Sequence, residues 1–228
     1  MKNRAILAWS GGKDSALALY EMTRQDRIQV VALLTTVTEG YDRISMHGVR
    51  RELLAEQAKA LGYPLEEVRL PQQCTNELYE QRMGQTLEKY HQSGIARAAF
   101  GDLLLEDVRA YREERLSRIG MRGIFPLWGR NTSEVARQFV GLGFRAVVVC
   151  VDTQALDRAF AGRDYDEDLL KDLPPEVDPC GENGEFHTFV YAGPVFRTPV
   201  RVERGARVLR ENRFYYCDLL AATPESER

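Results

Sequence analysis

The first 130 residues alternate between short apolar runs and amphipathic stretches, and this alternation constrains the fold more than any other feature of the sequence. The apolar runs have the length of buried strands, which we expect at residues 5–9, 30–37, 65–70, 96–100 and 123–127. Apolar residues recur every three or four positions between them, which predicts helices at 15–24, 49–61, 77–91 and 106–119. Because parallel strands need crossover connections, we predict an α/β fold with a doubly wound, five-stranded parallel sheet.

The character of the sequence changes after residue 130. We expect a capped helix at 132–142, strands at 146–151, 189–196 and 200–209, and between them a charged segment at 163–173 and a Gly- and Glu-rich loop at 178–188. We therefore divide the chain into a larger domain, residues 1–130, and a smaller α+β domain, residues 131–228. The last residues, 223–228, are expected to be frayed.

The loop after the first predicted strand has the composition of an anion-binding site. It reads Ser10-Gly11-Gly12-Lys13-Asp14-Ser15 and leads into a helix, so its backbone amides lie at a helix N-terminus. Lys13 adds a positive charge and the two serines add hydroxyl groups, which suits a polyphosphate, and Asp14 among phosphates suits a Mg²⁺ ligand. Two glycines in a turn with Asp14 as a helix cap would explain less, because Lys13 and the serines would have no role.

This loop resembles the PP-loop of the N-type ATP pyrophosphatases, a group with a HUP-like fold that forms adenylates and releases pyrophosphate. Further motifs resemble the diphthine-ammonia ligase family, and they are Ser45-Met46-His47, Glu56-Gln57-Ala58-Lys59-Ala60-Leu61-Gly62, Gly101-Asp102, Pro126-Leu127-Trp128 and Gly181-Glu182-Asn183-Gly184-Glu185-Phe186-His187-Thr188. The resemblance implies an ATP-binding domain with a smaller C-terminal domain, ATP and Mg²⁺ as cofactors, and amidation of an adenylated carboxylate by ammonia. The acceptor would be a small-molecule or a protein-borne carboxylate.

The late motif departs from the archaeal and eukaryotic members of that family. They carry Glu-Gly-Gly-Glu and then an acidic residue before Thr, whereas this chain has Gly181-Glu182-Asn183-Gly184-Glu185 and then His187-Thr188. The pattern resembles a bacterial branch, for which the resemblance implies an acceptor other than diphthine.

Several ionisable residues are candidates for the chemistry. Lys13 would stabilise the departing pyrophosphate, and Glu182, Glu185 or His187 could deprotonate ammonium, with Glu185 and His187 on one side of an extended segment. A solvated turn is the alternative for these three. Asp102 follows the fourth strand and could bind metal or acceptor, or cap the next helix. His47 could approach the adenosine, or be a cap or surface residue.

Other polar residues have simpler interpretations. Arg109, Arg112 and Arg115 could attract an anionic acceptor, but interleaved glutamates favour a self-paired solvent face. Cys74, Cys150 and Cys217 are interpreted as reduced cytoplasmic thiols, while Cys180 adjoins the late glutamates and is a site candidate.

Net charge and composition limit the partners. Thirty-one basic against 34 acidic residues give a net charge of −3, which argues against nucleic acid as a partner. Apolar runs are too short for a signal sequence or a membrane span, and we expect a cytoplasmic protein. A homodimer is compatible with the sequence, which does not determine the oligomeric state. Two alternatives to an amide ligase stay open: a tRNA-modifying adenylating enzyme and a non-catalytic module that binds ATP or AMP.

Overall fold

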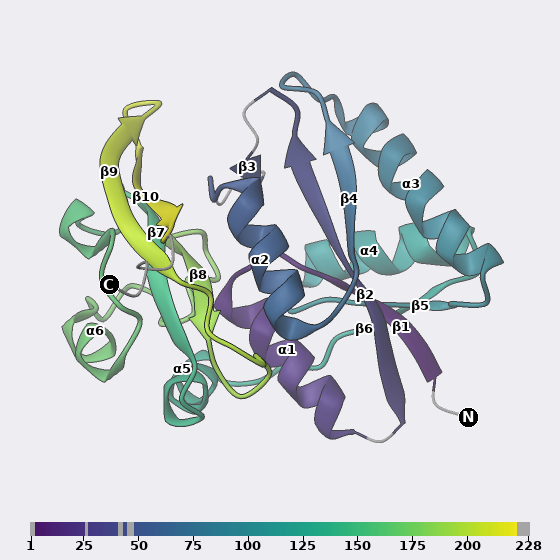
Figure 1. Cartoon of the computed structure of the whole chain (residues 1–228), viewed down its shortest axis with the longest axis horizontal. Coiled ribbons are helices and arrows are strands. Elements are labelled where there is room, and N and C mark those ends of the chain that lie inside the picture. Colours follow the sequence, from purple (N-terminus) through teal and green to yellow (C-terminus); the bar gives the residue numbers. More distant parts are fainter. Residues whose placement is uncertain (1–2, 26, 41–42, 45–47, 223–228) are drawn as a thin grey trace, which may run out of the picture.

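The computed structural model describes residues 3–25, 27–40, 43–44 and 48–222, which form two sheets (Figure 1). The first sheet has five parallel strands in the order β4-β2-β1-β5-β6. They are β1 (Asn3–Ala8), β2 (Ile28–Thr38), β4 (Leu65–Leu70), β5 (Arg97–Ala99) and β6 (Arg122–Ile124). A short β3 (Arg43–Ile44) pairs antiparallel with the end of β2. The predicted five-stranded parallel sheet is confirmed.

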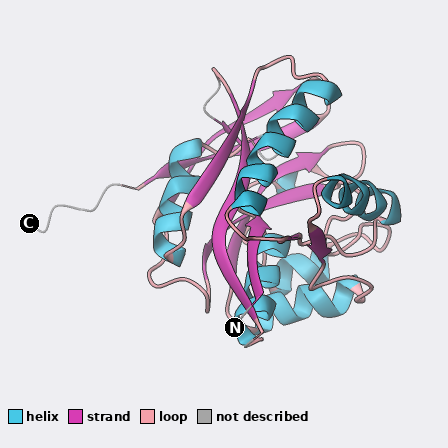
Figure 2. Ribbon diagram, turned by 90° about the vertical axis from the view of Figure 1, so that its right-hand side faces the viewer, coloured by secondary structure: helices cyan, strands magenta, loops and turns pink. Residues whose placement is uncertain are grey.

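Four helices cover the two faces of this sheet (Figures 1 and 2). Leu7 of β1 belongs to the same core as buried side chains of α1 (Lys13–Arg24) and α2 (Arg51–Leu61). Its neighbour Ile6 points to the other face, where α3 (Asn76–Gln92) and α4 (Glu106–Arg118) lie. Because adjacent residues of a strand face opposite sides, the two cores confirm the doubly wound arrangement.

The second sheet is antiparallel, in the order β8-β7-β10-β9, and forms the smaller domain. Its strands are β7 (Arg145–Asp152), β8 (Phe186–Ala192), β9 (Val202–Arg210) and β10 (Phe214–Ala221), and α5 (Thr132–Gly141), η1 (Arg158–Phe160) and α6 (Glu167–Asp172) accompany them. As expected, α5 is capped: the Asn131 side chain accepts a hydrogen bond from the Glu134 amide at 3.1 Å.

Three details differ from the predictions. Strand β10 was not predicted, although Glu211 and Asn212 have the positive φ values of a tight hairpin turn between β9 and β10. Strand β8 begins at Phe186, so the predicted 178–188 loop is shorter and His187 lies in a strand. Strand β6 ends at Ile124 because Phe125–Trp128 form a turn around Pro126.

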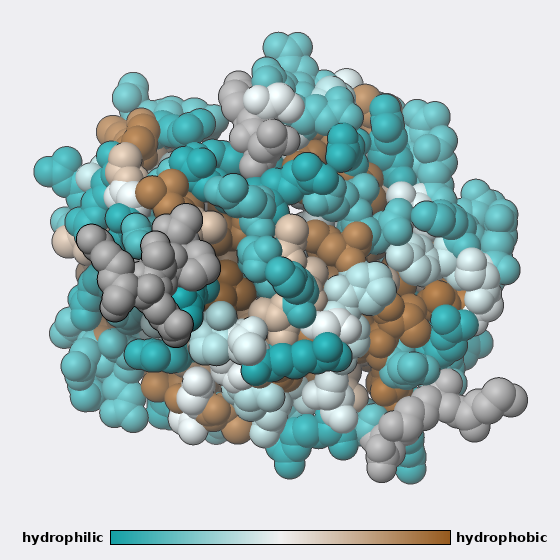
Figure 3. All heavy atoms as spheres, viewed as in Figure 1, coloured by the Kyte–Doolittle hydropathy of each residue, from teal (hydrophilic) through white to brown (hydrophobic). Residues whose placement is uncertain are grey.

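The two sheets share one hydrophobic core. Leu17 of α1 and Leu54 of α2 belong to the same buried cluster as Phe139 of α5, Val147 of β7 and Phe189 of β8. The division after residue 130 stays a prediction, and residues 223–228 lie outside the described part of the chain. The face in Figure 3 is mostly hydrophilic, with small apolar patches. In the described residues, every helix is too short or too polar to cross a membrane.

Candidate active site

The loop between β1 and α1 is held in one shape by its glycines and serines. Gly11 has a φ of 79°, and a Cβ there would come within 2.9 Å of the Gln57 side-chain oxygen. The Gly12 amide donates to Ser10 Oγ at 3.2 Å, and Ser15 Oγ donates to the Gly12 carbonyl at 2.9 Å. Gly12 precedes the first residue of α1, so the loop presents backbone amides at a helix N-terminus, as predicted.

A buried glutamine joins the loop to both sheets. Gln57 of α2 is fully buried; its side-chain nitrogen donates to the carbonyls of Gly11 and Val190, and its oxygen accepts from the Trp9 indole at 3.0 Å. The Val190 amide of β8 also donates to the Gly11 carbonyl at 2.9 Å. Because a buried amide without partners is costly, this network fixes the loop against the second sheet. No sequence signal indicated this role for Gln57.

Lys13 and Asp14 form an ion pair at the start of α1. The Lys13 ammonium is buried and lies 2.7 and 2.8 Å from the two carboxylate oxygens of Asp14. Burial lowers the pKa of Lys13, but the negative charges around it, first that of Asp14, outweigh burial and raise the pKa. Asp14 therefore favours the charged form of the buried Lys13 ammonium in this loop.

Two ionisable residues of the late motif line the same cavity as this ion pair. A cavity of about 200 Å³ is lined by Lys13 and Asp14 from the loop and by Glu182 and His187 from the second domain. Burial, and secondarily the charge of Asp14, raises the pKa of Glu182 to about 7. Burial, with the charge of Lys13 in second place, lowers the pKa of His187 to about 4. Near neutral pH, Glu182 therefore exchanges protons readily and His187 is a neutral imidazole.

Glu185 has a different environment from Glu182. Its buried carboxylate accepts hydrogen bonds from the backbone amides of Asp178 and Asn183, both at 3.0 Å, and from the Asn183 side chain at 2.9 Å. We expected Glu185 and His187 to face the same side, but this carboxylate faces its own turn because it satisfies amides there. In the structure, Glu185 shapes the loop that carries Glu182.

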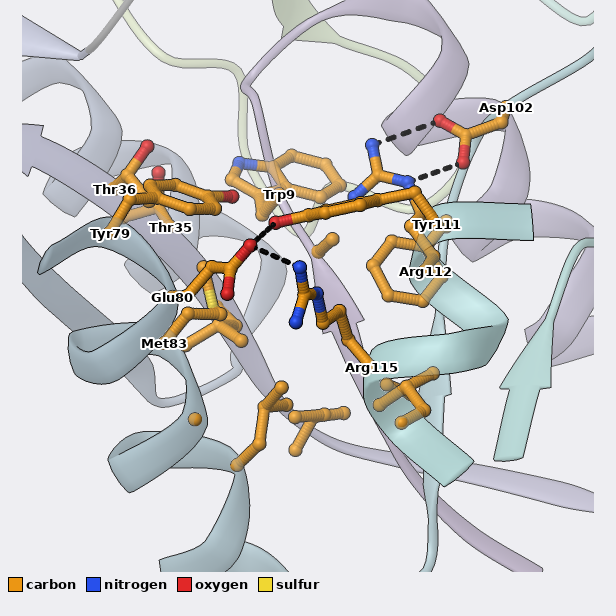
Figure 4. A pocket seen from close by; sticks show the side chains of 18 of the residues that line it. Trp9, Thr35, Thr36, Tyr79, Glu80, Met83, Asp102, Tyr111, Arg112 and Arg115 are labelled. Atoms are coloured by element: carbon orange, nitrogen blue, oxygen red, sulfur yellow. Dashed lines mark hydrogen bonds and ion pairs between the residues drawn. The ribbon is translucent and has the colours of Figure 1, made fainter. Parts of the chain in front are cut away.

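Asp102 follows β5 and lines a second, larger cavity of about 780 Å³ (Figure 4). Its carboxylate pairs with Arg112 of α4, with 2.7 Å between Asp102 Oδ2 and Arg112 Nε. The sequence analysis predicted that the arginines of α4 pair with glutamates on a solvent-facing side of the helix. This prediction holds for Arg109, which donates a hydrogen bond to Glu113 at 3.0 Å, and is wrong for Arg112 and Arg115. Arg115 pairs with Glu80 of α3, because both arginines turn toward the cavity.

The larger cavity contains side chains that the sequence analysis did not identify. Trp9, Thr35 and Thr36 come from the ends of β1 and β2, while Tyr79, Met83 and Tyr111 come from α3 and α4 (Figure 4). The only available signal was their position near the carboxyl ends of parallel strands, where ligands of α/β sheets bind. His47, a predicted nucleotide contact, lies outside the described residues.

Two family models match most of this chain. The diphthamide synthase N-terminal domain matches residues 2–123, and the diphthamide synthase C-terminal domain matches residues 131–220. The chain belongs to the diphthamide synthase family. The resemblance inferred from the PP-loop and the late motif is thereby confirmed.

Individual relatives of this diphthamide synthase family member are distant. The diphthine–ammonia ligase of Mus musculus is 25% identical over 234 residues, covering 88% of this chain and 83% of the mouse protein. The diphthine–ammonia ligase of Homo sapiens is 23% identical, with the same coverage of 88% and 83%. Among solved structures, the U34-tRNA thiolase NcsA from Methanococcus maripaludis, with its [4Fe-4S] cluster, aligns with a TM-score of 0.37 and 17% identity, covering 63% of this chain and 59% of that one.

Proposed function

We propose that this protein is an ATP-dependent ligase that adenylates a carboxylate, releases pyrophosphate and amidates the adenylate with ammonia. One observation carries the proposal: the PP-loop with Lys13 lines the same cavity as Glu182 and His187 of the other domain. A phosphate-binding loop and a proton-transfer group are thus near one reacting centre. Membership of the family, whose mouse and human members are named diphthine–ammonia ligase, supports ATP as the nucleotide and amide formation as the reaction.

The first step needs stabilisation of the charge that develops on pyrophosphate. The carboxylate attacks the α-phosphorus, its new oxygen–phosphorus bond forms, and the bond to the β-phosphate oxygen breaks. Lys13 would leave Asp14 and pair with the outer phosphates, since its charge is retained in the buried cavity. The amides of Gly12 and Lys13 already donate to Ser10 Oγ and Thr188 Oγ1, so the other amides at the start of α1 would bind the same oxygens.

A Mg²⁺ ion fits the chemistry of this cavity. Asp14 presents a hard carboxylate next to the loop, and one or two carboxylates plus substrate phosphates commonly bind Mg²⁺ in nucleotide sites. Among the described residues, no group of three or more His, Cys, Asp and Glu side chains is arranged for a metal, so phosphate oxygens would complete the shell. Bound there, the ion would neutralise phosphate charge.

The second step needs a base, because ammonium is the dominant form near neutral pH and cannot attack a carbonyl carbon. Glu182, with a pKa of about 7, would accept the proton of ammonium or of the tetrahedral adduct. The carbon–nitrogen bond then forms as the bond between the acyl carbon and the AMP oxygen breaks. The neutral imidazole of His187 would accept or donate a hydrogen bond in this step.

The cysteines support amidation over sulfur transfer. Cys180 lines the cavity, but burial raises the pKa of its thiol to about 12, and its Sγ donates to the Thr132 carbonyl. A thiol that stays protonated is a poor nucleophile and a poor sulfur carrier. The net charge of −3 likewise disfavours a tRNA substrate.

Exchange of labelled pyrophosphate into ATP tests the proposal, because exchange requires a reversible adenylate. Wild type should exchange label in the presence of an acceptor from a panel of carboxylates, and should form AMP and amide when ammonium is added. Lys13→Ala should lose exchange, while Lys59→Ala, which removes a lysine whose side chain is 79% exposed, should retain it. Formation of ADP in place of AMP would overturn the assignment.

A further inference from the structure

The turn between α6 and β8 carries Glu182 to the place where the two cavities meet. Glu182 lines both of them, the small cavity beside Lys13 and the large one beside β1 and β5. A group that transfers a proton there must be held accurately, because a displacement near 1 Å can cost about a hundredfold in rate. The residues that hold this turn therefore affect the reaction without touching the substrate.

Asp178 begins the turn and accepts hydrogen bonds from two of its amides. Asp178 Oδ1 accepts from the Cys180 amide at 2.8 Å and from the Glu182 amide at 3.3 Å. The Asp178 carbonyl accepts from the Gly181 amide at 2.8 Å. The side chain of Asp178 thus fixes the backbone of Glu182 directly, from four residues earlier in the chain.

The three carboxylates of this turn have separate environments. Glu185 accepts from the amides of Asp178 and Asn183, and Asp178 accepts from those of Cys180 and Glu182. Each of these two carboxylates therefore satisfies backbone amides within the turn. Glu182 is the carboxylate of the turn that lines both cavities.

The turn is also packed against the core of the second domain. Gly181 has a φ of 66°, and a Cβ there would lie 2.8 Å from the Phe186 carbonyl oxygen. Tyr165 is buried, and its hydroxyl donates to the Pro179 carbonyl at 2.5 Å. Because Tyr165 and Phe186 belong to the main hydrophobic core, the turn has a fixed base on which Asp178 can act.

The first domain contacts the Glu182 side chain from the other direction. The Leu103 amide, in the loop after β5, donates a hydrogen bond to the Glu182 carboxylate, and Lys13 and Asp14 are the charged groups of α1 that line the same cavity. The Leu103 carbonyl accepts from the Gly129 amide at 2.9 Å, so this loop is itself held in place. Asp178 therefore fixes the backbone of Glu182, while Leu103 orients its carboxylate.

We propose that Asp178 is a positioning residue for Glu182, which it holds at the reacting centre by accepting the hydrogen bonds of the Cys180 and Glu182 amides. This inference rests on the proposed function and adds to its second step a residue that does not touch the substrate. The role requires an acceptor oxygen at position 178. An asparagine, whose side-chain oxygen can accept the same two hydrogen bonds, should therefore replace Asp178, and an alanine should not.

Two substitutions of Asp178 and one matched control test the proposal. Asp178→Ala removes the acceptor and Asp178→Asn retains it. Asp166→Ala is the control, because the Asp166 side chain likewise accepts from a backbone amide, that of Leu169 at 2.9 Å, at the start of α6 in the same domain. Carbon-13 NMR of protein labelled at the glutamate carboxyl carbons would follow Glu182, whose signal is assigned by its loss in Glu182→Gln.

The NMR signal would be recorded at pH 8, above the pKa of about 7 of Glu182, before and after addition of α,β-methylene-ATP with Mg²⁺. In wild type, Asp178→Asn and Asp166→Ala, the nucleotide should shift the Glu182 signal. In Asp178→Ala this shift should fall by at least half, while the affinity for the nucleotide stays within threefold. A wild-type shift in Asp178→Ala, or an equal loss in Asp178→Asn and Asp178→Ala, would overturn the inference.

Rates of the two steps give a second readout, with a carboxylate that supports pyrophosphate exchange and with ammonium as the nucleophile. Asp178→Ala should lower amide formation at least tenfold and exchange less than threefold, and Asp178→Asn should restore most of the rate. Equal losses in both steps would mean general damage to the fold and would also reject the inference. If the NMR pattern holds and no carboxylate supports exchange, the positioning role stands and the proposed reaction fails.

Discussion

Gly101 places the end of β5 directly against the first turn of α1, and this contact leads to our most specific prediction. A Cβ at position 101 would lie 2.8 Å from the carbonyl carbon of Asp14 and 3.0 Å from the Ser15 amide nitrogen. Ordinary contacts begin near 3.4 Å, so Gly101→Ala must move the loop or β5 by about 0.6 Å, the difference between 3.4 and 2.8 Å. Both neighbours are backbone atoms, so no rotamer change can relieve the clash.

Gly101→Ala should lower the free energy of unfolding modestly and the rate of pyrophosphate release more strongly. Overpacking costs about 1–3 kcal/mol, and reduced freedom of the unfolded chain returns about 0.4–1 kcal/mol, so the free energy of unfolding should fall by about 1–2 kcal/mol. A displacement of this size at the phosphates should lower the rate of pyrophosphate release by on the order of tenfold or more, because positioning errors near 1 Å can cost about a hundredfold.

Urea unfolding and single-turnover pyrophosphate release would measure the two effects. Gly141→Ala is the control, since it adds a Cβ to a glycine of α5 where no described atom lies within 4 Å. If Gly101→Ala folds with wild-type stability and releases pyrophosphate at the wild-type rate, the close approach of β5 to the loop has no role in phosphate positioning.

Three further substitutions test single groups in the loop cavity. Lys13→Ala should lower pyrophosphate release by about 100–1000-fold, the cost of losing one group that stabilises developing charge; normal turnover would contradict this role. Hydroxylamine is mostly unprotonated near neutral pH and converts an acyl adenylate to a hydroxamate, so with it the base acts on the tetrahedral adduct. The wild-type rate of hydroxamate formation should rise with pH about a midpoint near 7. Glu182→Gln should lose that midpoint and about 100-fold in rate, unlike the exposed control Glu176→Gln. His187 stays neutral when folded, with a pKa of about 4 against 6.5 unfolded, so the unfolded state binds more protons between these values and stability falls as pH falls. Between pH 7 and 4.5, the free energy of unfolding measured by urea titration should therefore fall by about 2–3 kcal/mol less in His187→Gln than in wild type. If the two proteins lose stability in parallel over this range, His187 is not buried as a neutral group.

The parallel sheet could be predicted because local pattern and global fold agree in it. Its central strands β1 and β2 are largely buried on both faces and therefore read as apolar runs, as residues 30–37 do for β2. The antiparallel sheet has an exposed edge, and β9 is mostly exposed along its length. Its partner β10 carries Asp218, which pairs with Arg43 and Arg50, so the expected apolar alternation is interrupted. The sequence analysis therefore missed β10 because its polar side chain Asp218 forms ion pairs with residues distant in the sequence.

The PP-loop was predictable for the same reason, because its function depends on backbone amides and on adjacent residues. The side chains that line the walls of the larger cavity could not be predicted from the sequence. Whether Arg115 of α4 faces solvent or Glu80 of α3 depends on how far α4 lies from α3, and helical spacing does not determine that distance. Gln57 is a similar case, since its partners Trp9, Gly11 and Val190 come from three other segments.

Glu182 and Glu185 show what spacing alone leaves open at the reacting centre. Both are glutamates of one glycine-rich turn, and from the sequence they are equally good candidates for the base. Three hydrogen-bond donors already occupy the Glu185 carboxylate, and a base that accepts a proton there would have to release them. Glu182 instead lines both cavities, and its pKa of about 7 follows from burial beside Asp14. The surroundings of the two carboxylates therefore divide their roles: Glu185 shapes the turn and Glu182 transfers the proton. This division predicts that the pH dependence of amide formation disappears when Glu182 is replaced and persists in any folded variant of Glu185.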